Sequence, residues 1–382
     1  NAAGVAPEVL EAMLPFLTDF YGNASSIHRF GGQVHKCIDT AREQVAGLLG
    51  ARPEEIIFTS CGTESDNTAI LSALENSVTR RKVVTTRVEH PAILGLCTVL
   101  QKRGYHIEYC PVNNKGMLCL DQICDMIDDQ TAIVSVMWAN NETGNVYPAI
   151  NLADIAHERG ALFHTDAVQA VGKVPIDLSR TSIDFLSLSG HKLHAPKGIG
   201  ALYVRKGVQV APVLLGGGQE RGLRSGSEDL ASIVGFAAAA DIMAAGMPAE
   251  VDRIRAIRDR LIERVLAEIP DSHLNGHPEQ RAPNNAHFRF DAVEGEAMVL
   301  SLRDEGIAAS TGSACSSKTL EPSHTLISCG LLHEEAHGSL EFTFGRWSRM
   351  EDVDRIMKAL PGVIARLRAL SPLYKTSAPA AP

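Results

Sequence analysis

The sequence predicts an α/β protein of about two domains, the larger one built on a mostly parallel seven-stranded sheet. With 382 residues, the chain is long enough for two domains that each have a core. Short apolar runs alternate with helical patterns between residues 42 and 204. This order is typical of βαβ units, in which helices cover both faces of a parallel sheet. After a Gly-Met-Pro break at Gly246–Pro248 the order changes to that of a smaller α+β domain.

The seven expected strands are short runs bounded by turn residues, at residues 55–60, 82–86, 106–112, 132–139, 161–167, 183–189 and 198–204. The helices expected around and after them cover residues 42–49, 67–74, 92–102, 152–159 and 231–245. Beyond the break we expect a helix at 251–268, a strand at 285–290, a helix at 295–304 and two more strands. The predicted large domain is 12–248, the small domain is 1–11 with 249–372, and 373–382 is a disordered tail.

Charge and cysteine content restrict the partners that we expect. The formal net charge is -9 and no long Lys/Arg run is present, which argues against nucleic acid and membrane surfaces. No window approaches the ~18 apolar residues of a membrane span, and we expect no leader. The eight cysteines are scattered, which favours reduced thiols in a cytoplasmic protein.

Polar residues follow several of the expected strands, where ligands of open α/β sheets bind. After the first strand, Cys61-Gly62-Thr63 opens a helix whose backbone N–H groups could hold a phosphate. An ordinary N-cap, with Thr63 and Asp66 as a capping box, is the alternative. The residues at the other strand ends are His90, Asn140-Asn141-Glu142, Asp166 with Gln169, and His191-Lys192.

Each of these signals alone has a simple structural interpretation, such as a turn residue, a helix cap or a solvated lysine. Together they provide a phosphate cradle, a flat ring, a carboxylate and an amine. Pyridoxal phosphate needs an amine for its aldehyde, a carboxylate for its pyridine nitrogen and a phosphate site. We therefore predict that Lys192 is the Schiff-base lysine. Lys197 lies between Pro196 and Gly198, in a turn that leads to the next strand.

The strings "FTSCGTESDNTAI", "EHPA", "MWANNETG", "HTDAVQAVGK", "SGHKLHAPKG" and "GGGQERGLRSGS" resemble the cysteine desulfurases. "SGHKLHAPKG" and "GSACSSKTLEPSH" are most similar to the NifS type that serves nitrogenase. The resemblance covers roughly residues 7–370. It implies a PLP-dependent transferase of fold type I that forms a homodimer and converts L-cysteine to L-alanine. The sulfur would pass through an enzyme persulfide to an iron–sulfur scaffold protein.

The resemblance also implies roles for individual residues. Lys192 would bind the cofactor and act as base, His90 would stack on its ring and serve as acid/base, and Cys315 would attack the substrate sulfur. Asp166 would pair with the pyridine nitrogen and Gln169 with the phenolic oxygen. The implied cofactor-binding residues are Gly62, Thr63, His90, Asn141, Asp166, Gln169, Ser189, Gly190, His191, Lys192 and, from the other subunit, Ser227. The implied substrate-binding residues are Asn141 and Arg346.

Cys315 has neighbours that agree with such a role. The surrounding Ser, Thr, Gly and Ala residues supply no apolar anchor, so we expect a mobile surface loop. A thiolate that collects sulfur and passes it on needs such a loop. We interpret the other seven cysteines as small buried hydrophobic residues. No metal site is predicted, apart from Cys315 as a transient iron–sulfur ligand.

Glu341 departs from the family pattern. Relatives generally carry an arginine at this place in "HGSLEFTFGRWS", which pairs with the substrate α-carboxylate, whereas a glutamate repels it. Arg346 is the substitute candidate. This departure leaves open a variant with impaired turnover or a nonenzymatic sulfur scaffold.

Other functions remain as alternatives at this point. Three share the cofactor: selenocysteine lyase, cysteine-sulfinate desulfinase and aminotransferase. A remote alternative is a zinc peptidase, because His333-Glu-Glu-Ala-His337 matches H-E-x-x-H. However, Gly338 and Ser339 end that helix at once, and the sequence shows no third ligand.

Overall fold

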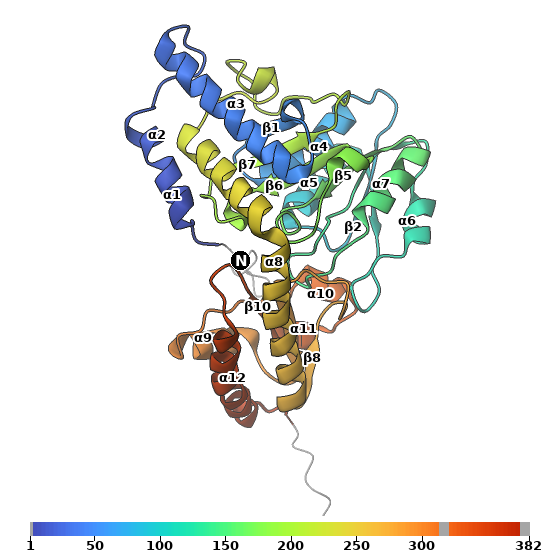
Figure 1. Cartoon of the computed structure of the whole chain (residues 1–382). Helices are drawn as coiled ribbons and strands as arrows, with labels where there is room; N and C mark the ends of the chain where they lie inside the picture. Colours follow the sequence, from blue (N-terminus) through green and yellow to red (C-terminus); the bar gives the residue numbers. More distant parts are fainter. Residues whose placement is uncertain (1–2, 313–320, 375–382) are drawn as a thin grey trace, which may run out of the picture. The chain divides into compact units, whose positions relative to one another are not determined.

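The computed structural model describes residues 3–312 and 321–374, and its contacts divide the chain into two compact units (Figure 1). The first unit comprises Asn1–Pro111, Leu118–Asn140 and Val146–Met247, and the second Val112–Met117, Asn141–Asn145 and Pro248–Pro382. The expected division differs, because it put residues 1–11 in the small domain. The Ala6 N–H donates to the His194 carbonyl at 3.0 Å, and Ala6 is buried within the first unit.

The first unit contains the seven-stranded sheet, with strand order β1-β7-β6-β5-β4-β2-β3. Its strands are β1 (Ile56–Thr59), β2 (Lys82–Thr86), β3 (His106–Cys110), β4 (Thr131–Ser135), β5 (Leu162–Asp166), β6 (Phe185–Ser189) and β7 (Gly200–Val204). Only β7 runs against the others, because it pairs antiparallel with both β1 and β6. The short connection after β6 lacks the crossover that a parallel neighbour needs. The predicted fold class is confirmed.

Helices surround this sheet. They are α1 (Pro7–Met13), α2 (Pro15–Thr18), α3 (Arg29–Leu49), α4 (Gly62–Glu75), α5 (Pro91–Lys102), α6 (Leu120–Met126) and α7 (Ala149–Glu158). Helix α4 contacts the strands β4, β5, β6 and β7. Its small buried residues Ala69 and Ala73 allow the helix to lie close to the sheet. The N-terminus of α4 is therefore fixed at the edge where the parallel strands end.

Helix α8 (Leu230–Glu268) continues through the expected break at Gly246–Pro248, so that prediction was wrong. A proline inside a helix removes one backbone hydrogen bond. Burial on both sides holds the helix together, by Phe236 before the proline and by Leu261 after it. A stretch of α8 is also long and apolar enough for a membrane span, contrary to the expectation from the sequence. Half of that stretch is buried in the protein, as in a core helix.

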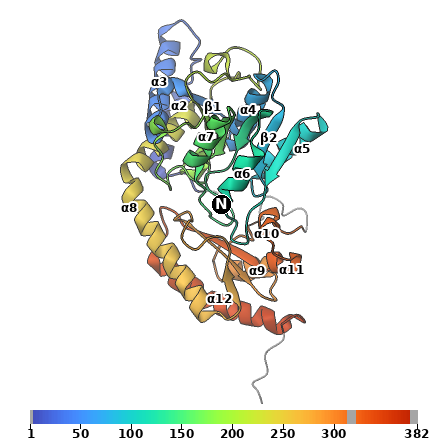
Figure 2. The ribbon, with the colours of Figure 1, turned by 90° about the vertical axis from the view of Figure 1, so that its right-hand side faces the viewer.

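The second unit has a three-stranded antiparallel sheet with the order β10-β9-β8. Its elements are β8 (Ser272–Leu274), β9 (Asn285–Phe290), α9 (Gly295–Asp304), α10 (His324–Ser328), α11 (His333–His337), β10 (Ser339–Thr343) and α12 (Met350–Leu370). Helix α12 runs beside the C-terminal half of α8 (Figure 2), where Arg264 pairs with Asp354 at 2.9 Å.

The two faces of this small sheet differ in character. Phe288, Phe290 and Phe342 lie in an apolar cluster that includes residues of α8, α9 and α12. On the opposite face His287 and Glu341 are register partners, and both are buried. Side chains of one strand alternate between faces, so the polar set is built by the same strands that make the core. The sheet therefore buries a polar face as well as an apolar one.

We predict that Gly246→Ala stabilises the protein by roughly 0.5–1 kcal/mol, because alanine is the better residue in a helix interior. Among the described residues, no atom lies within 4 Å of the Cβ that the substitution adds. Gly31→Ala in α3 is the matched control, because its Cβ would lie 2.3 Å from the Ser26 carbonyl oxygen. Urea unfolding midpoints should rise for the first variant and fall for the second. A fall for Gly246→Ala would argue against a continuous α8.

Candidate active site

The start of α4 approaches the ends of β5 and β6 closely. A Cβ on Gly62 would lie 2.7 Å from Val168 Cγ2 and 3.8 Å from Ser189 Cβ. Only glycine permits this approach, so the predicted phosphate cradle lies next to two other strand ends. The capping-box alternative was wrong, because α4 already begins at Gly62 and Asp66 is buried.

The connection between β6 and β7 carries Lys192. Residues Gly190–Lys192 form a 3-10 turn, in which the Gly190 N–H donates to the Ile199 carbonyl at 3.0 Å. Lys192 is half-buried, whereas Lys197 is exposed. The environments of the two lysines thus differ as the sequence predicts, because Lys192 is the more sheltered of the two.

His191, beside Lys192, has a buried Nδ1 with no hydrogen-bond partner among the residues that the structure describes. Burial, and next the charge of Lys192, lower the pKa of His191 to about 4. A buried nitrogen without a partner is costly unless a bound group satisfies it. This nitrogen is therefore suited to contact a ligand at the strand ends.

Asp166, the last residue of β5, lies near both His90 and Lys192. Its side chain accepts a hydrogen bond from the Val168 N–H at 2.9 Å. Burial raises the pKa of Asp166, while electrostatic interactions with His90 and then Lys192 oppose this rise. The structure thus brings three of the predicted site residues together at one edge of the sheet.

His90 is the N-cap of α5, and its Nδ1 accepts the Ala92 N–H at 3.1 Å. Because Nδ1 of the neutral imidazole acts as the acceptor, the ring proton lies on Nε2. The ring is therefore fixed in orientation and presents a donor on its other side. Pro91 at the first helical position needs no N–H partner, so the turn and the helix start are compatible.

Two further carboxyl groups near Asp166 were missed from the sequence. Burial, and next the charge of Asp166, raise the pKa of Asp66. Glu89 is fully buried and accepts the Met137 N–H at 3.1 Å and the Thr86 hydroxyl at 2.8 Å, and burial raises its pKa to about 8. The position of Glu89 directly before His90 was the available signal.

The remaining predicted residues of the first unit have varied environments. Ser189 and Gly190 are buried, Gln169 is half-buried, and Thr63 and Ser227 are exposed. The Nζ of Lys173 donates to the Gln169 carbonyl oxygen at 3.2 Å.

Asn141, Arg346 and Glu341 belong to the second unit, and Cys315 lies outside the described residues. Asn141 and Arg346 are half-buried. Glu341 is 3% exposed, and its Oε1 accepts a hydrogen bond from Asn285 Nδ2 at 2.8 Å. Its carboxyl group therefore has a neutral partner on the neighbouring strand.

The interpretation of the other cysteines as buried hydrophobic residues holds for three of the seven. Cys97, Cys110 and Cys329 are buried, and burial raises their pKa values to about 12, 11 and 11. The prediction was wrong for Cys119, which is exposed because it directly precedes the start of α6 at the surface. Cys37, Cys61 and Cys124 are half-buried.

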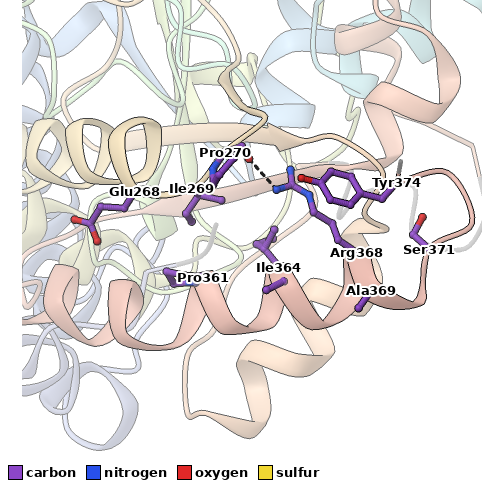
Figure 3. Close-up of a pocket in the computed structure, with 10 residues that line it drawn as sticks. Glu268, Ile269, Pro270, Pro361, Ile364, Arg368, Ala369, Ser371 and Tyr374 are labelled. Carbon is purple, nitrogen blue, oxygen red and sulfur yellow. Dashed lines mark hydrogen bonds between the residues drawn. The ribbon is translucent and has the colours of Figure 1, made fainter. Parts of the chain in front are cut away.

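His337, the last residue of the H-E-x-x-H match, and a pocket both belong to the second unit. Within the described ranges no group of three His, Cys, Asp or Glu side chains could hold a metal, and His337 of α11 lies 3.7 Å from Glu294. A pocket in the second unit (Figure 3) lies between α12 and the end of α8. There Arg368 donates to the Pro270 carbonyl at 2.8 Å and contacts Tyr374. No predicted site residue lines it.

Comparison with known proteins gives the class of this site and then its family. Residues 2–356 match the aminotransferase class-V family model. The chain is 50% identical over 374 residues to a cysteine desulfurase of Trichormus azollae and 49% identical over 376 residues to the cysteine desulfurase NifS of Azotobacter vinelandii. Each match covers 98% of this chain and 94% of the relative. The chain therefore belongs to the class-V aminotransferases and, within them, to the cysteine desulfurases.

Solved structures agree with this assignment. A NifS-like protein matches with a TM-score of 0.90 and 33% identity, covering 96% of this chain and 98% of its own. SspA, solved in complex with cysteine, matches with a TM-score of 0.79 and 32% identity, covering 90% and 96%. The resemblance found in the sequence is confirmed.

Members of this family depend on pyridoxal phosphate, and the strand ends fit this cofactor. The glycine start of α4 and the unsatisfied Nδ1 of His191 are suited to its phosphate. A protonated pyridine nitrogen requires a carboxylate partner. Asp166 is a buried carboxyl group at the strand ends, and the nearby charge of Lys192 favours its ionised form. Lys192 would bind the aldehyde.

We predict that Glu89→Gln weakens the pH dependence of stability. The pKa of Glu89 is raised from 4.5 to about 8 in the folded chain, so the folded protein holds a proton that the unfolded chain releases. The stability from this proton is fully present below pH 4.5 and is lost as the pH rises to about 8, by at most about 1.4 kcal/mol per pH unit. Urea unfolding across this range should give a steeper fall for the wild type. Equal slopes would contradict the prediction.

Proposed function

We propose that this protein removes sulfur from L-cysteine and releases L-alanine. The observation that supports this is the meeting of His90, Asp166 and Lys192 at the strand ends, in a chain whose relatives are cysteine desulfurases. The carbon–sulfur bond of the substrate breaks as a sulfur–sulfur bond to Cys315 forms. The released electron pair stays on carbon, which takes up a proton. L-cysteine and an enzyme thiol thus give L-alanine and an enzyme persulfide, without an external oxidant.

The residues of this chain divide the work. When bound, pyridoxal phosphate withdraws electrons from the substrate carbons. Lys192 removes the Cα proton, and Asp166 balances positive charge at the ring nitrogen. His90, whose Nδ1 is occupied by the Ala92 N–H, holds its proton on Nε2 for transfer near the substrate sulfur. The Cys315 thiolate is the nucleophile.

The partners and location follow from the same assignment. We propose a cytoplasmic homodimer in which Ser227 contacts the cofactor of the other subunit, and the exposure of Ser227 supports such a contact. The persulfide would pass to an iron–sulfur scaffold protein, with nitrogenase as the end user. The similarity to NifS of Azotobacter vinelandii supports this choice. Cys315 would serve as a transient iron–sulfur ligand during that transfer.

Cys315→Ala tests the function directly. We expect it to lose sulfide release while it keeps its bound cofactor, because the thiol acts on sulfur and not on the cofactor. The measurement is sulfide and alanine production from L-cysteine, together with the cofactor absorbance spectrum. Cys119→Ala is the control, since Cys119 is exposed and has no proposed role. Full desulfurase activity in Cys315→Ala would refute the nucleophile assignment.

Lys192→Ala tests the cofactor-binding lysine. Borohydride should fix the cofactor to the wild-type chain but not to this variant, because reduction makes the bond to the lysine nitrogen permanent. Lys197→Ala should still be labelled like the wild type. Peptide mapping gives the labelled residue, and label on Lys197 would overturn the assignment.

Glu341→Arg tests the departure from the family pattern. If the Glu341 carboxylate opposes that of the substrate, this variant should lower KM for cysteine about tenfold per 1.4 kcal/mol recovered. Glu341→Gln is the control that removes the charge but keeps an acceptor for Asn285. Arg346→Ala should abolish turnover if Arg346 binds the substrate carboxylate. An unchanged KM in both Glu341 variants would mean that Glu341 does not affect substrate binding and serves only as the partner of Asn285.

A further inference from the structure

Glu142 is a buried acid that the proposed reaction does not use. It lies in the Asn141–Asn145 segment of the second unit and is 4% exposed. Its Oε2 accepts a hydrogen bond from the Ser323 hydroxyl. Burial raises its pKa, while the hydrogen bond from Ser323 and the charge of His324 oppose this. A buried carboxyl group is costly unless it is well bonded, so its placement needs a reason.

The same oxygen lies against Gly312. A Cβ on Gly312 would be 3.3 Å from Glu142 Oε2 and 3.0 Å from His287 Cε1. Gly312 also has a φ of 79°, a conformation that favours glycine. Two residues earlier, Ser310 pairs with Glu341, since the Ser310 N–H donates to the Glu341 carbonyl at 3.2 Å. The chain is therefore fixed against the buried polar face up to Gly312.

Ser323 fixes the chain again on the far side of Cys315. Its hydroxyl oxygen caps α10 by accepting the Leu326 N–H at 3.2 Å, and the residue is 4% exposed. The neighbouring Thr325, 1% exposed, adds a side-chain hydrogen bond to Glu142. The same carboxylate oxygen thus accepts a hydrogen bond from Ser323 and lies where a Cβ on residue 312 would be 3.3 Å away.

We propose that Glu142 is a positioning residue that holds together the two ends of the chain segment carrying Cys315. The proposal rests on the proposed function, in which Cys315 is the nucleophile. Bringing two chain ends together costs conformational entropy, and a hydrogen bond at Ser323 with close packing at Gly312 against one buried group offsets that cost. Glu142 acts through the segment and not on the substrate.

The test compares Glu142→Ala with Glu142→Gln in the holoenzyme. Glutamine keeps an acceptor for the Ser323 hydroxyl, so it should stay within a few-fold of the wild type. Alanine removes the acceptor and leaves a cavity. For Glu142→Ala we expect trypsin cleavage after Lys318 to accelerate at least tenfold. Its kcat should fall at least tenfold, with KM for cysteine and cofactor content unchanged.

The control is Glu55→Ala, which removes another buried acid that accepts the Lys206 N–H at 2.9 Å in the first unit. Equal acceleration of cleavage in this control would mean general loosening and would overturn the proposal. So would wild-type cleavage and kcat in Glu142→Ala. Should that variant not fold, Ser323→Ala, which removes the donor to the same oxygen, is judged by the same criteria.

These readouts separate the two hypotheses. If the wild type produced neither sulfide nor alanine from L-cysteine, the proposed function would fail. Cleavage after Lys318 would still report whether Glu142 holds the segment, because this measurement needs no turnover. Loss of kcat without faster cleavage in Glu142→Ala would instead overturn the positioning role and leave the proposed function intact.

Discussion

Three buried carboxyl groups, Asp66, Glu89 and Asp166, lie within electrostatic range of one another where the parallel strands end. Charged acids repel at such a place, and burial penalises the charge of each. Electrostatic interactions with His90 and Lys192 offset part of this penalty for Asp166. The direction of the strands, the glycine start of α4 and the turn after β6 all bring the compensating groups to that edge.

The second unit also buries polar groups, and there the buried Arg281 donates from Nη2 to Asn285 Oδ1 at 3.2 Å. Asn285 Nδ2 bonds both the Glu142 carbonyl oxygen at 2.9 Å and Glu341 Oε1 at 2.8 Å. One amide therefore connects the Asn141–Asn145 segment to the strand β10. Buried polar networks of this kind favour one arrangement because a partly satisfied alternative is costly. An arginine at position 341 could not accept this bond, so the glutamate contributes to what holds the small sheet together.

The sequence was sufficient to predict the bounds of those strands and helices that depend on local interactions. Strands β2 and β9 and helix α9 have the predicted bounds, because period, turn residues and caps decide them. The predicted helix break at Gly246–Pro248 was wrong, because burial on both sides of it outweighs the low helix propensity of glycine and proline. Asp66 and Glu89 were missed because burial and the distance to Asp166 depend on strands far apart in the sequence. Cys119 was misassigned for the same reason, since exposure is a property of the assembled fold.

The antiparallel pairing of β7 has a consequence for the order of folding. Ser189 and Gly200 are register partners, so the lysine-bearing turn is closed by contacts between residues close in sequence. The other pairs of this sheet join strands that are more distant along the chain, and such contacts form more slowly. The stem beneath Lys192 can thus pair before the parallel part of the sheet is complete. The turn that carries Lys192 would then form before the ends of the parallel strands assemble around it.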